Sequence, residues 1–209
     1  MEFKTALKAM DPKTPEQLLE CMISTIDNSD VARFVRDVVD DEIMKTFKKA
    51  ASSSGKYHPE VSNGDWGLLN HTALTLLVFD TFYTFYKVQG KYFEDTFDSC
   101  RAALILHDAW KYTHLSGKVN ANFTTKEHGY VGAQKLLTYI RKHGNDYESK
   151  AQAIIIDSIV HVRYHMSNWC HNTDESNYVK TDASTPNILV MLADFISSNK
   201  ALFEYTKIC

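Results

Sequence analysis

Glycine and proline are scarce in this sequence, with 8 and 4 residues respectively among 209. Turn signals are therefore thin, and no convincing alternation of apolar and polar residues marks β-strands. The four cysteines lie far apart and form no C-x-x-C pair, which excludes a zinc ribbon and a thioredoxin-type dithiol. A run of about 18 apolar residues is also lacking, so no membrane-spanning helix and no membrane partner are expected.

The chain also lacks a strong excess of charge of either sign. It has 23 basic and 26 acidic residues and a net charge of -3, which excludes a strongly basic nucleic-acid-binding coat. Binding to long duplex nucleic acid is therefore not expected. The N-terminal segment has no apolar core of the kind found in signal peptides, so we expect a cytoplasmic protein with reduced thiols.

Segments with a 3.6-residue apolar period are present throughout the chain and predict an all-α bundle of about seven helices. Thr14, Pro15 and Gln17 have the spacing of a helix N-cap, and residues 50–64 have the composition of a loop. The expected helices cover approximately residues 14–26, 29–48, 65–87, 92–110, 124–143, 147–165 and 184–203.

The chain shows no clear domain boundary, and we expect one compact domain. Residues 1–50 contain no candidate catalytic side chains and are expected to form a helical pair. This pair would pack on a core of residues 51–209, which contains the candidate functional residues.

Histidine and aspartate occur on segments that are otherwise apolar. His107 and Asp108 follow the run Ala102–Leu106, and a neighbouring imidazole and carboxylate can bind one metal ion. His71 lies near the start of an apolar helix. Asp194 lies in another apolar stretch, where a carboxylate is costly to bury unless it is paired or binds a cation. Taken alone, each residue can be explained by a salt bridge or a hydrogen-bonded core histidine.

The order His…His-Asp…Asp over residues 56–203 resembles the HD-domain superfamily of metal-dependent phosphohydrolases. The resemblance implies an α-helical bundle with a metal centre whose four core ligands are His71, His107, Asp108 and Asp194. It rests on six motifs in this order: Tyr57-His58-Pro59, Gly67–Thr72 (GLLNHT), Leu104–Lys111 (LILHDAWK), Lys126–Ala133 (KEHGYVGA), His165–Trp169 (HMSNW) and Leu192–Asp194 (LAD).

Family members with two metal ions use two further histidines, and the resemblance implies that His128 is the first of them. Both His161 and His165 suit the second role, because they are four residues apart and share a helix face. We favour His165, since His165–Trp169 resembles the histidine-plus-tryptophan ending found in part of the family. His161 would then lie behind the ligands or against the substrate.

Asp108 is the natural bridging ligand, because one carboxylate has two oxygens to share. Two divalent ions about 3.5–4 Å apart would generate a metal-activated hydroxide as the nucleophile. Mixed imidazole and carboxylate ligands suit Mn²⁺, Fe²⁺, Ni²⁺ or Co²⁺, and suit Mg²⁺ less well if all six side chains bind.

Lys111 completes the family pattern His-Asp-x-x-Lys that begins at His107. It is expected to grip a phosphate oxygen or to stabilise departing charge, and is therefore a candidate catalytic residue together with Asp108. A solvated lysine near a helix end is the alternative explanation. Further substrate contacts are expected from side chains on or near the motifs: His58, Lys126, His161, Arg163 and Trp169.

The resemblance implies hydrolysis of a phosphodiester bond in a nucleotide, which is a cyclic mono-, di- or oligonucleotide or a short oligonucleotide. A one-metal 5′-nucleotidase or deoxynucleoside triphosphate hydrolase needs only the four core ligands and is the main alternative. A non-catalytic HD module that binds a nucleotide without cleaving it is a second alternative. A homo-oligomer is compatible with the sequence.

Overall fold

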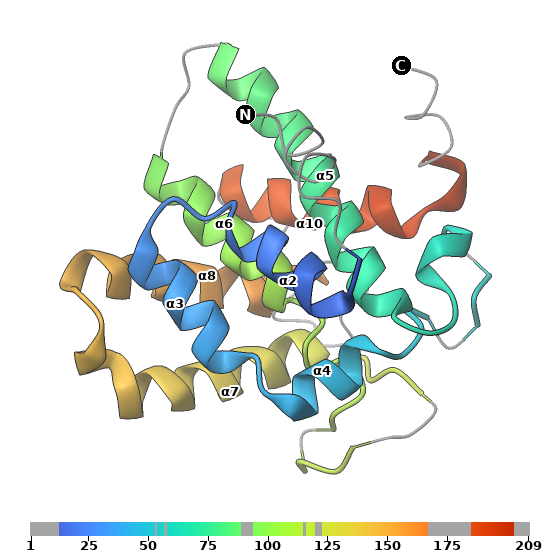
Figure 1. Cartoon of the computed structure of the whole chain (residues 1–209), viewed down its shortest axis with the longest axis horizontal. Helices are drawn as coiled ribbons and strands as arrows, with labels where there is room; N and C mark the ends of the chain where they lie inside the picture. Colours follow the sequence, from blue (N-terminus) through green and yellow to red (C-terminus); the bar gives the residue numbers. More distant parts are fainter. Residues whose placement is uncertain are drawn as a thin grey trace.

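The computed structural model describes residues 13–52, 54–56, 58–88, 94–114, 116–119, 123–166 and 185–202 (Figure 1). The expectation of an all-α fold is confirmed. Across these residues there is no β-strand, apart from one isolated bridge between Thr113 and Val119. The helices are α2 (Pro15–Ile23), α3 (Ser29–Val38), α4 (Asp41–Phe47), α5 (Gly67–Val88), α6 (Glu94–Leu106), α7 (His128–His143), α8 (Ser149–Tyr164) and α10 (Thr185–Ser198), with two short 3-10 helices, η1 (Glu60–Ser62) and η2 (Gly144–Asp146).

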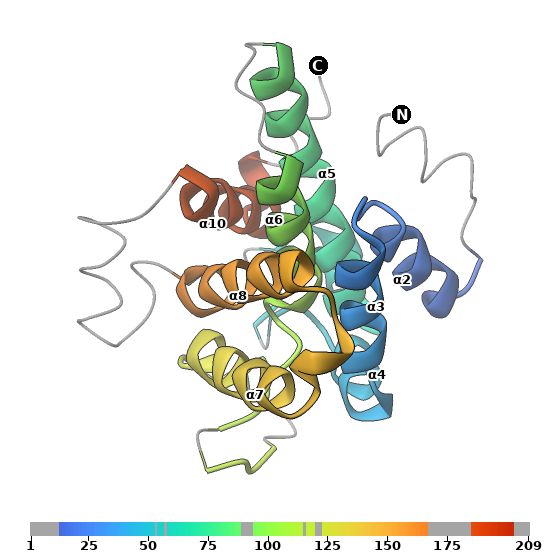
Figure 2. The ribbon, with the colours of Figure 1, turned by 90° about the vertical axis from the view of Figure 1, so that its left-hand side faces the viewer.

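The helices pack in three layers around the central pair α5 and α6. Figure 2 shows α10, α8 and α7 stacked on one side of this pair and α2, α3 and α4 on the other. One continuous cluster of buried apolar side chains joins all three layers. The start of α5 and the end of α6 lie deep in the bundle, where Leu68, Leu69 and Leu104–Leu106 are fully buried.

The first helix begins as predicted, whereas the prediction of a single helix over residues 29–48 was wrong. Thr14 Oγ1 accepts a hydrogen bond from the backbone N–H of Gln17, and Pro15 occupies the first helical position. The single helix expected over 29–48 is two helices, because Val39 is extended and Asp40 caps the next helix through the N–H of Ile43. An aspartate that competes with the helix backbone explains the break.

Two helix ends next to the candidate functional residues differ from the prediction. α6 ends at Leu106 rather than near 110, so that His107 and Asp108 lie in the turn that follows it. α7 begins at His128 rather than near 124. Thr125 ties this segment to the turn after α6: its N–H donates to the carbonyl of Lys111 (2.8 Å), and its hydroxyl donates to the carbonyl of Thr113 (3.0 Å).

The loop before α5 is closely packed against the start of that helix. The backbone N–H groups of Trp66 and Leu68 donate to the carbonyls of Lys48 and Lys49, each at 2.8 Å. A Cβ atom at Gly67 would lie 2.4 Å from the carbonyl oxygen of Ser62, so only glycine allows this approach. These contacts fix the first turns of α5.

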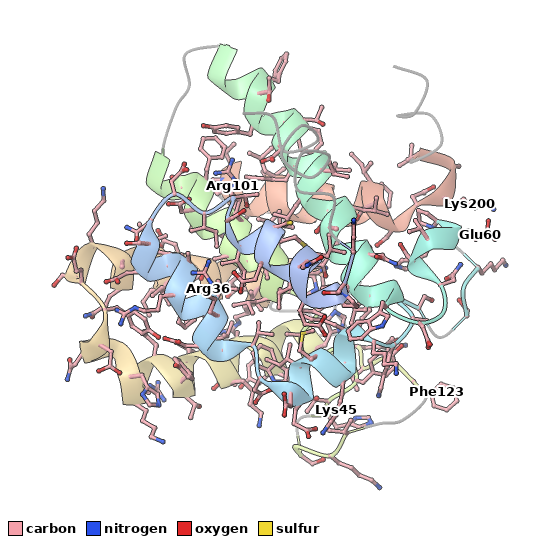
Figure 3. All side chains as sticks on the ribbon, in the orientation of Figure 1. Arg36, Lys45, Glu60, Arg101, Phe123 and Lys200 are labelled. Carbon is pink, nitrogen blue, oxygen red and sulfur yellow. The ribbon has the colours of Figure 1, made fainter. Side chains whose placement is uncertain are left out.

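Polar contacts also join α5 to α6. Arg101 lies between these helices (Figure 3), where its guanidinium is 3.3 Å from the carboxylate of Asp80 and stacks over the ring of Tyr83. Among the residues described, no helix is both long and apolar enough to cross a membrane.

Candidate metal centre

Six side chains from five elements meet at the end of α6. His71 comes from α5, His107 and Asp108 from the turn after α6, and His128 from the first position of α7. All four of these side chains are buried, and Asp108 is only 1% exposed. Two more complete the set, His165 just after α8 and Asp194 in α10. The structure therefore brings together all six side chains that the sequence predicted as metal ligands.

The first group contains His71, His107 and Asp108 and can hold a metal ion. The Nε2 atoms of the two histidines lie 3.4 Å apart, and Oδ2 of Asp108 is 3.6 Å from His71 Nε2 and 3.3 Å from His107 Nε2. Asp194 faces the same pair, with its Oδ1 3.0 Å from His71 Nε2 and 3.7 Å from His107 Nε2. The four core ligands predicted from the sequence thus point to one place.

The second group contains Asp108, His128 and His165 and can also hold a metal ion. Oδ1 of Asp108 lies 2.9 Å from His128 Nε2 and 3.7 Å from His165 Nε2. The two Nε2 atoms are 3.1 Å apart. Asp108 therefore presents one oxygen to each histidine pair.

Three of the four histidines are oriented by the same local contact. Nδ1 of His107, His128 and His165 is hydrogen-bonded to the carbonyl of the residue three positions earlier. A carbonyl only accepts, so each Nδ1 carries a proton, and without a second proton the ring presents a lone pair at Nε2. A hydrogen bond of this kind, from the ring nitrogen that does not bind the metal, is typical of metal-ligating histidines.

The donor atoms fit a cation. In the second group, the lone pairs of two imidazoles and a carboxylate oxygen face one another at 2.9–3.7 Å. Lone pairs at these distances repel one another unless a proton or a metal ion lies between them. Oδ1 of Asp108 is buried and accepts no hydrogen bond from any residue in the described part of the chain. Burying such an atom is costly unless a cation compensates it.

The pKa values of His107 and Asp108 in the first group also indicate that the site favours a positive charge. Burial lowers the pKa of His107, but the carboxylates of Asp108 and Asp194 outweigh burial and raise that pKa to about 10. Burial raises the pKa of Asp108, yet His107 and Lys111 outweigh it and hold that pKa well below its usual range. A proton on His107 therefore occupies the position where a metal ion would bind, and the two compete.

Two predicted substrate contacts lie beside the cluster. Lys111 Nζ is 2.6 Å from Oδ2 of Asp108, and the side chain is largely buried. The ring of His58 lies 5.2 Å from the ring of His71. Both ring nitrogens of His58 are buried, and neither has a hydrogen-bond partner among the described residues. Burial, with the charges of His71 and Lys111 in addition, lowers the pKa of His58 to about 4.

The other predicted substrate residues are placed elsewhere. His161 contacts Ser99 and Asn187 instead of the cluster. Lys126 is exposed just before α7, and the guanidinium of Arg163 lies over the rings of Tyr130 and Tyr164. Trp169 lies outside the described residues.

Sequence reasoning missed the groups that hold the ligands in place. Ser198 donates to Oδ1 of Asp194 at 3.2 Å, one helical turn away. The carbonyls that orient three histidines belong to Leu104, Thr125 and Val162. Ser198 could have been identified from its position four residues after Asp194. The sequence does not show which backbone carbonyls accept hydrogen bonds.

Comparison with protein-family models, with curated proteins and with solved structures gave no match. The HD-domain relationship therefore stays a prediction from the sequence motifs.

Proposed function

We propose that this protein is a metal-dependent phosphohydrolase of the HD type, which binds two divalent ions and cleaves a phosphodiester bond of a nucleotide or short oligonucleotide. One observation carries the proposal: the two oxygens of Asp108 face separate, buried histidine pairs. A carboxylate arranged in this way can bridge two ions. Ions bound there would supply an activated water at neutral pH and would neutralise a phosphoryl group.

The chain supplies the remaining functions of such a site. Burial lowers the pKa of Lys111, but Asp108 and Asp194 outweigh burial and raise that pKa, so the ammonium group keeps its charge. It can therefore stabilise negative charge on a phosphate oxygen. His58 has unpartnered ring nitrogens next to His71 and can donate a hydrogen bond to a substrate oxygen.

The ligand chemistry favours particular metals. Four imidazoles and two carboxylates form a set of mixed hardness that suits Mn²⁺, Fe²⁺, Co²⁺ or Ni²⁺, while Mg²⁺ prefers oxygen ligands and water. No cysteine sulfur is part of either metal-binding group in the described residues. We therefore expect Mn²⁺ to support turnover better than Mg²⁺.

The one-metal alternative, a nucleotidase or triphosphate hydrolase, needs only the first group and Asp194. The second group disfavours it, because His128 and His165 are buried, oriented and aimed at the free oxygen of Asp108. The other alternative is a module that binds a nucleotide without cleaving it. Such a module would be expected to lack one of the metal-ligating side chains, whereas all six predicted ligands are present in this chain.

Elemental analysis of the purified protein, combined with a Mn²⁺-supplemented turnover screen, tests the proposal. The screen contains nucleoside mono- and triphosphates, cyclic mono-, di- and oligonucleotides, and short RNA. We expect about two ions per chain and cleavage of a phosphodiester. One ion with release of phosphate or triphosphate would support the one-metal alternative. Nucleotide binding without turnover with any divalent ion would support the binding module.

A further inference from the structure

A second buried polar cluster joins three of the helices that supply the metal ligands. His161 of α8 is hydrogen-bonded through Nδ1 to Oδ1 of Asn187 in α10. Its Nε2 atom lies 3.2 Å from the hydroxyl of Ser99 in α6. All three side chains are buried.

Each member of this cluster precedes a proposed metal-ligand position by a short interval along the chain. His161 is one helical turn before His165, and Asn187 is two turns before Asp194. Ser99 lies about two turns before His107. The cluster and the proposed metal centre are therefore consecutive layers of the same three-helix interface.

Most other buried side chains of these three helices are apolar and give little control over the relative positions of the helices. They include Leu104 and Ile105 of α6, Ile155 and Ile159 of α8 and Val190 of α10. Such contacts tolerate small sliding movements, because the hydrophobic effect is non-directional. A buried hydrogen bond has a narrow range of distance and angle, and leaving its partners unsatisfied is costly.

A neutral imidazole can make both hydrogen bonds of His161. Nδ1–H donates to the Asn187 oxygen, and Nε2 remains as an acceptor for the hydroxyl of Ser99. The Ser99 hydroxyl has a single proton, which it donates either to this nitrogen (3.2 Å) or to the carbonyl of Thr96 (2.8 Å). One proton on the ring therefore serves both neighbouring helices.

We infer that His161, with Ser99 and Asn187, is a positioning residue that sets the register of α6, α8 and α10 and so places His165, His107 and Asp194 around the metal ions. This inference rests on the proposed metal centre. It replaces the sequence-based expectation that His161 contacts the substrate.

The test is a Mn²⁺ titration followed by electron paramagnetic resonance, because two ions that share a carboxylate give a spin-coupled signal that single ions lack. The wild type is compared with His161→Leu and with the control Ile155→Ala. The control removes buried packing from the same helix but leaves the polar cluster intact. We expect His161→Leu to weaken Mn²⁺ binding by about 10–100-fold and to lose the coupled signal. The control should keep both. Ser99→Ala, which removes one hydrogen bond, is the milder variant if His161→Leu does not fold.

The outcomes separate the inference from the proposed function. A wild-type protein that binds no Mn²⁺ would overturn the proposed function, and the positioning role would fall with it. Wild-type affinity and coupling in both His161→Leu and Ser99→Ala would overturn the inference and leave the proposed function intact. An equal loss of affinity in Ile155→Ala would also overturn it, because general destabilisation would then explain the effect.

Discussion

Nζ of Lys111 lies 2.6 Å from Oδ2 of Asp108, the same oxygen that faces His71 and His107. The lysine thus adds a fixed positive charge to the first group of ligands without being able to bind a metal itself. A charge in this position can interact with the substrate, or it can hold Asp108 in place.

Lys111→Ala tests these roles. If the ammonium group stabilises developing charge on the phosphate, kcat should fall by about 10²-fold or more while metal content stays unchanged. Steady-state kinetics and elemental analysis measure the two effects. Lys135→Ala, at an exposed position on α7, is the matched control and should behave as the wild type. Loss of metal from Lys111→Ala would show that the lysine orders the ligands instead.

Asp108→Ala should abolish both metal binding and turnover, because Asp108 is the only side chain shared by the two groups. Helix content should be largely unchanged, since Asp108 lies in the turn after α6. Asp108→Asn keeps the shape but cannot bridge two ions, and should also be inactive. Circular dichroism, metal analysis and turnover measure these outcomes. Full activity in either variant would refute the assignment of the site.

His128→Ala and His71→Ala distinguish a two-metal from a one-metal site. The first substitution removes a ligand of the second group only, so one ion should remain bound while cleavage of the phosphodiester is lost. The second removes a ligand of the first group, and the ion between His128 and His165 should remain. Metal content and rate are measured on the same samples. A His128→Ala protein with wild-type metal content and rate would favour the one-metal alternative.

Mn²⁺ should stabilise the folded protein, because the ligands come from five elements that the unfolded chain does not hold together. At a free concentration of about 100 times Kd, the free energy of unfolding should rise by about 2.7 kcal/mol. For a chain of this size that corresponds to a rise in Tm of about 5 °C or more. Differential scanning calorimetry measures the shift, and a chelator should reverse it. A shift of the same size in Asp108→Asn would mean that the ion binds elsewhere.

The metal-free protein should lose stability below about pH 6.5, in part because of His161. Burial lowers the pKa of His161, and the Asn187 hydrogen bond and the charge of Asp157 oppose this only partly. As the pH falls through the pKa of an unperturbed histidine, the unfolded chain gains a proton that the folded state does not accept, so folding becomes less favourable. Above this pH the ring is neutral in both states, and no such loss occurs.

Urea unfolding at pH 7.5 and pH 5.5 measures this effect. The loss of stability between the two pH values should be smaller in His161→Gln than in the wild type. Equal losses in the two proteins would contradict the prediction.

Much of the fold was readable from apolar periodicity, and the errors have a common cause. The helices that end in the protein interior were predicted too long, because the apolar pattern continues past the last helical hydrogen bond. His107 and Asp108 follow Leu106 without any glycine or proline, so nothing in the sequence marks the turn. The break at Asp40 was marked only by an aspartate, which is also common on helix surfaces.

The six ligand positions were predicted from the order of motifs, and the structure supplies what the motifs lack. Spacing alone could not decide between His161 and His165, which are four residues apart, and only the motif His165–Trp169 favoured His165. In the structure their partners differ: His165 lies near Asp108, and His161 is hydrogen-bonded to Asn187. Those partners lie on other helices, and only the packed bundle brings them together.

The metal ligands span much of the chain, since His71 and Asp194 are 3.0 Å apart in space but 123 residues apart in sequence. Each ion would be held by ligands from three separate segments and would keep its bonds to the other two when one segment frays. Release would require ligands of more than one segment to separate, which makes it slower than release from a site on a single loop. The bound metal would therefore be exchanged slowly even in a large excess of a competing ion, and the identity of the metal in the purified protein would record which ion was present when the chain folded.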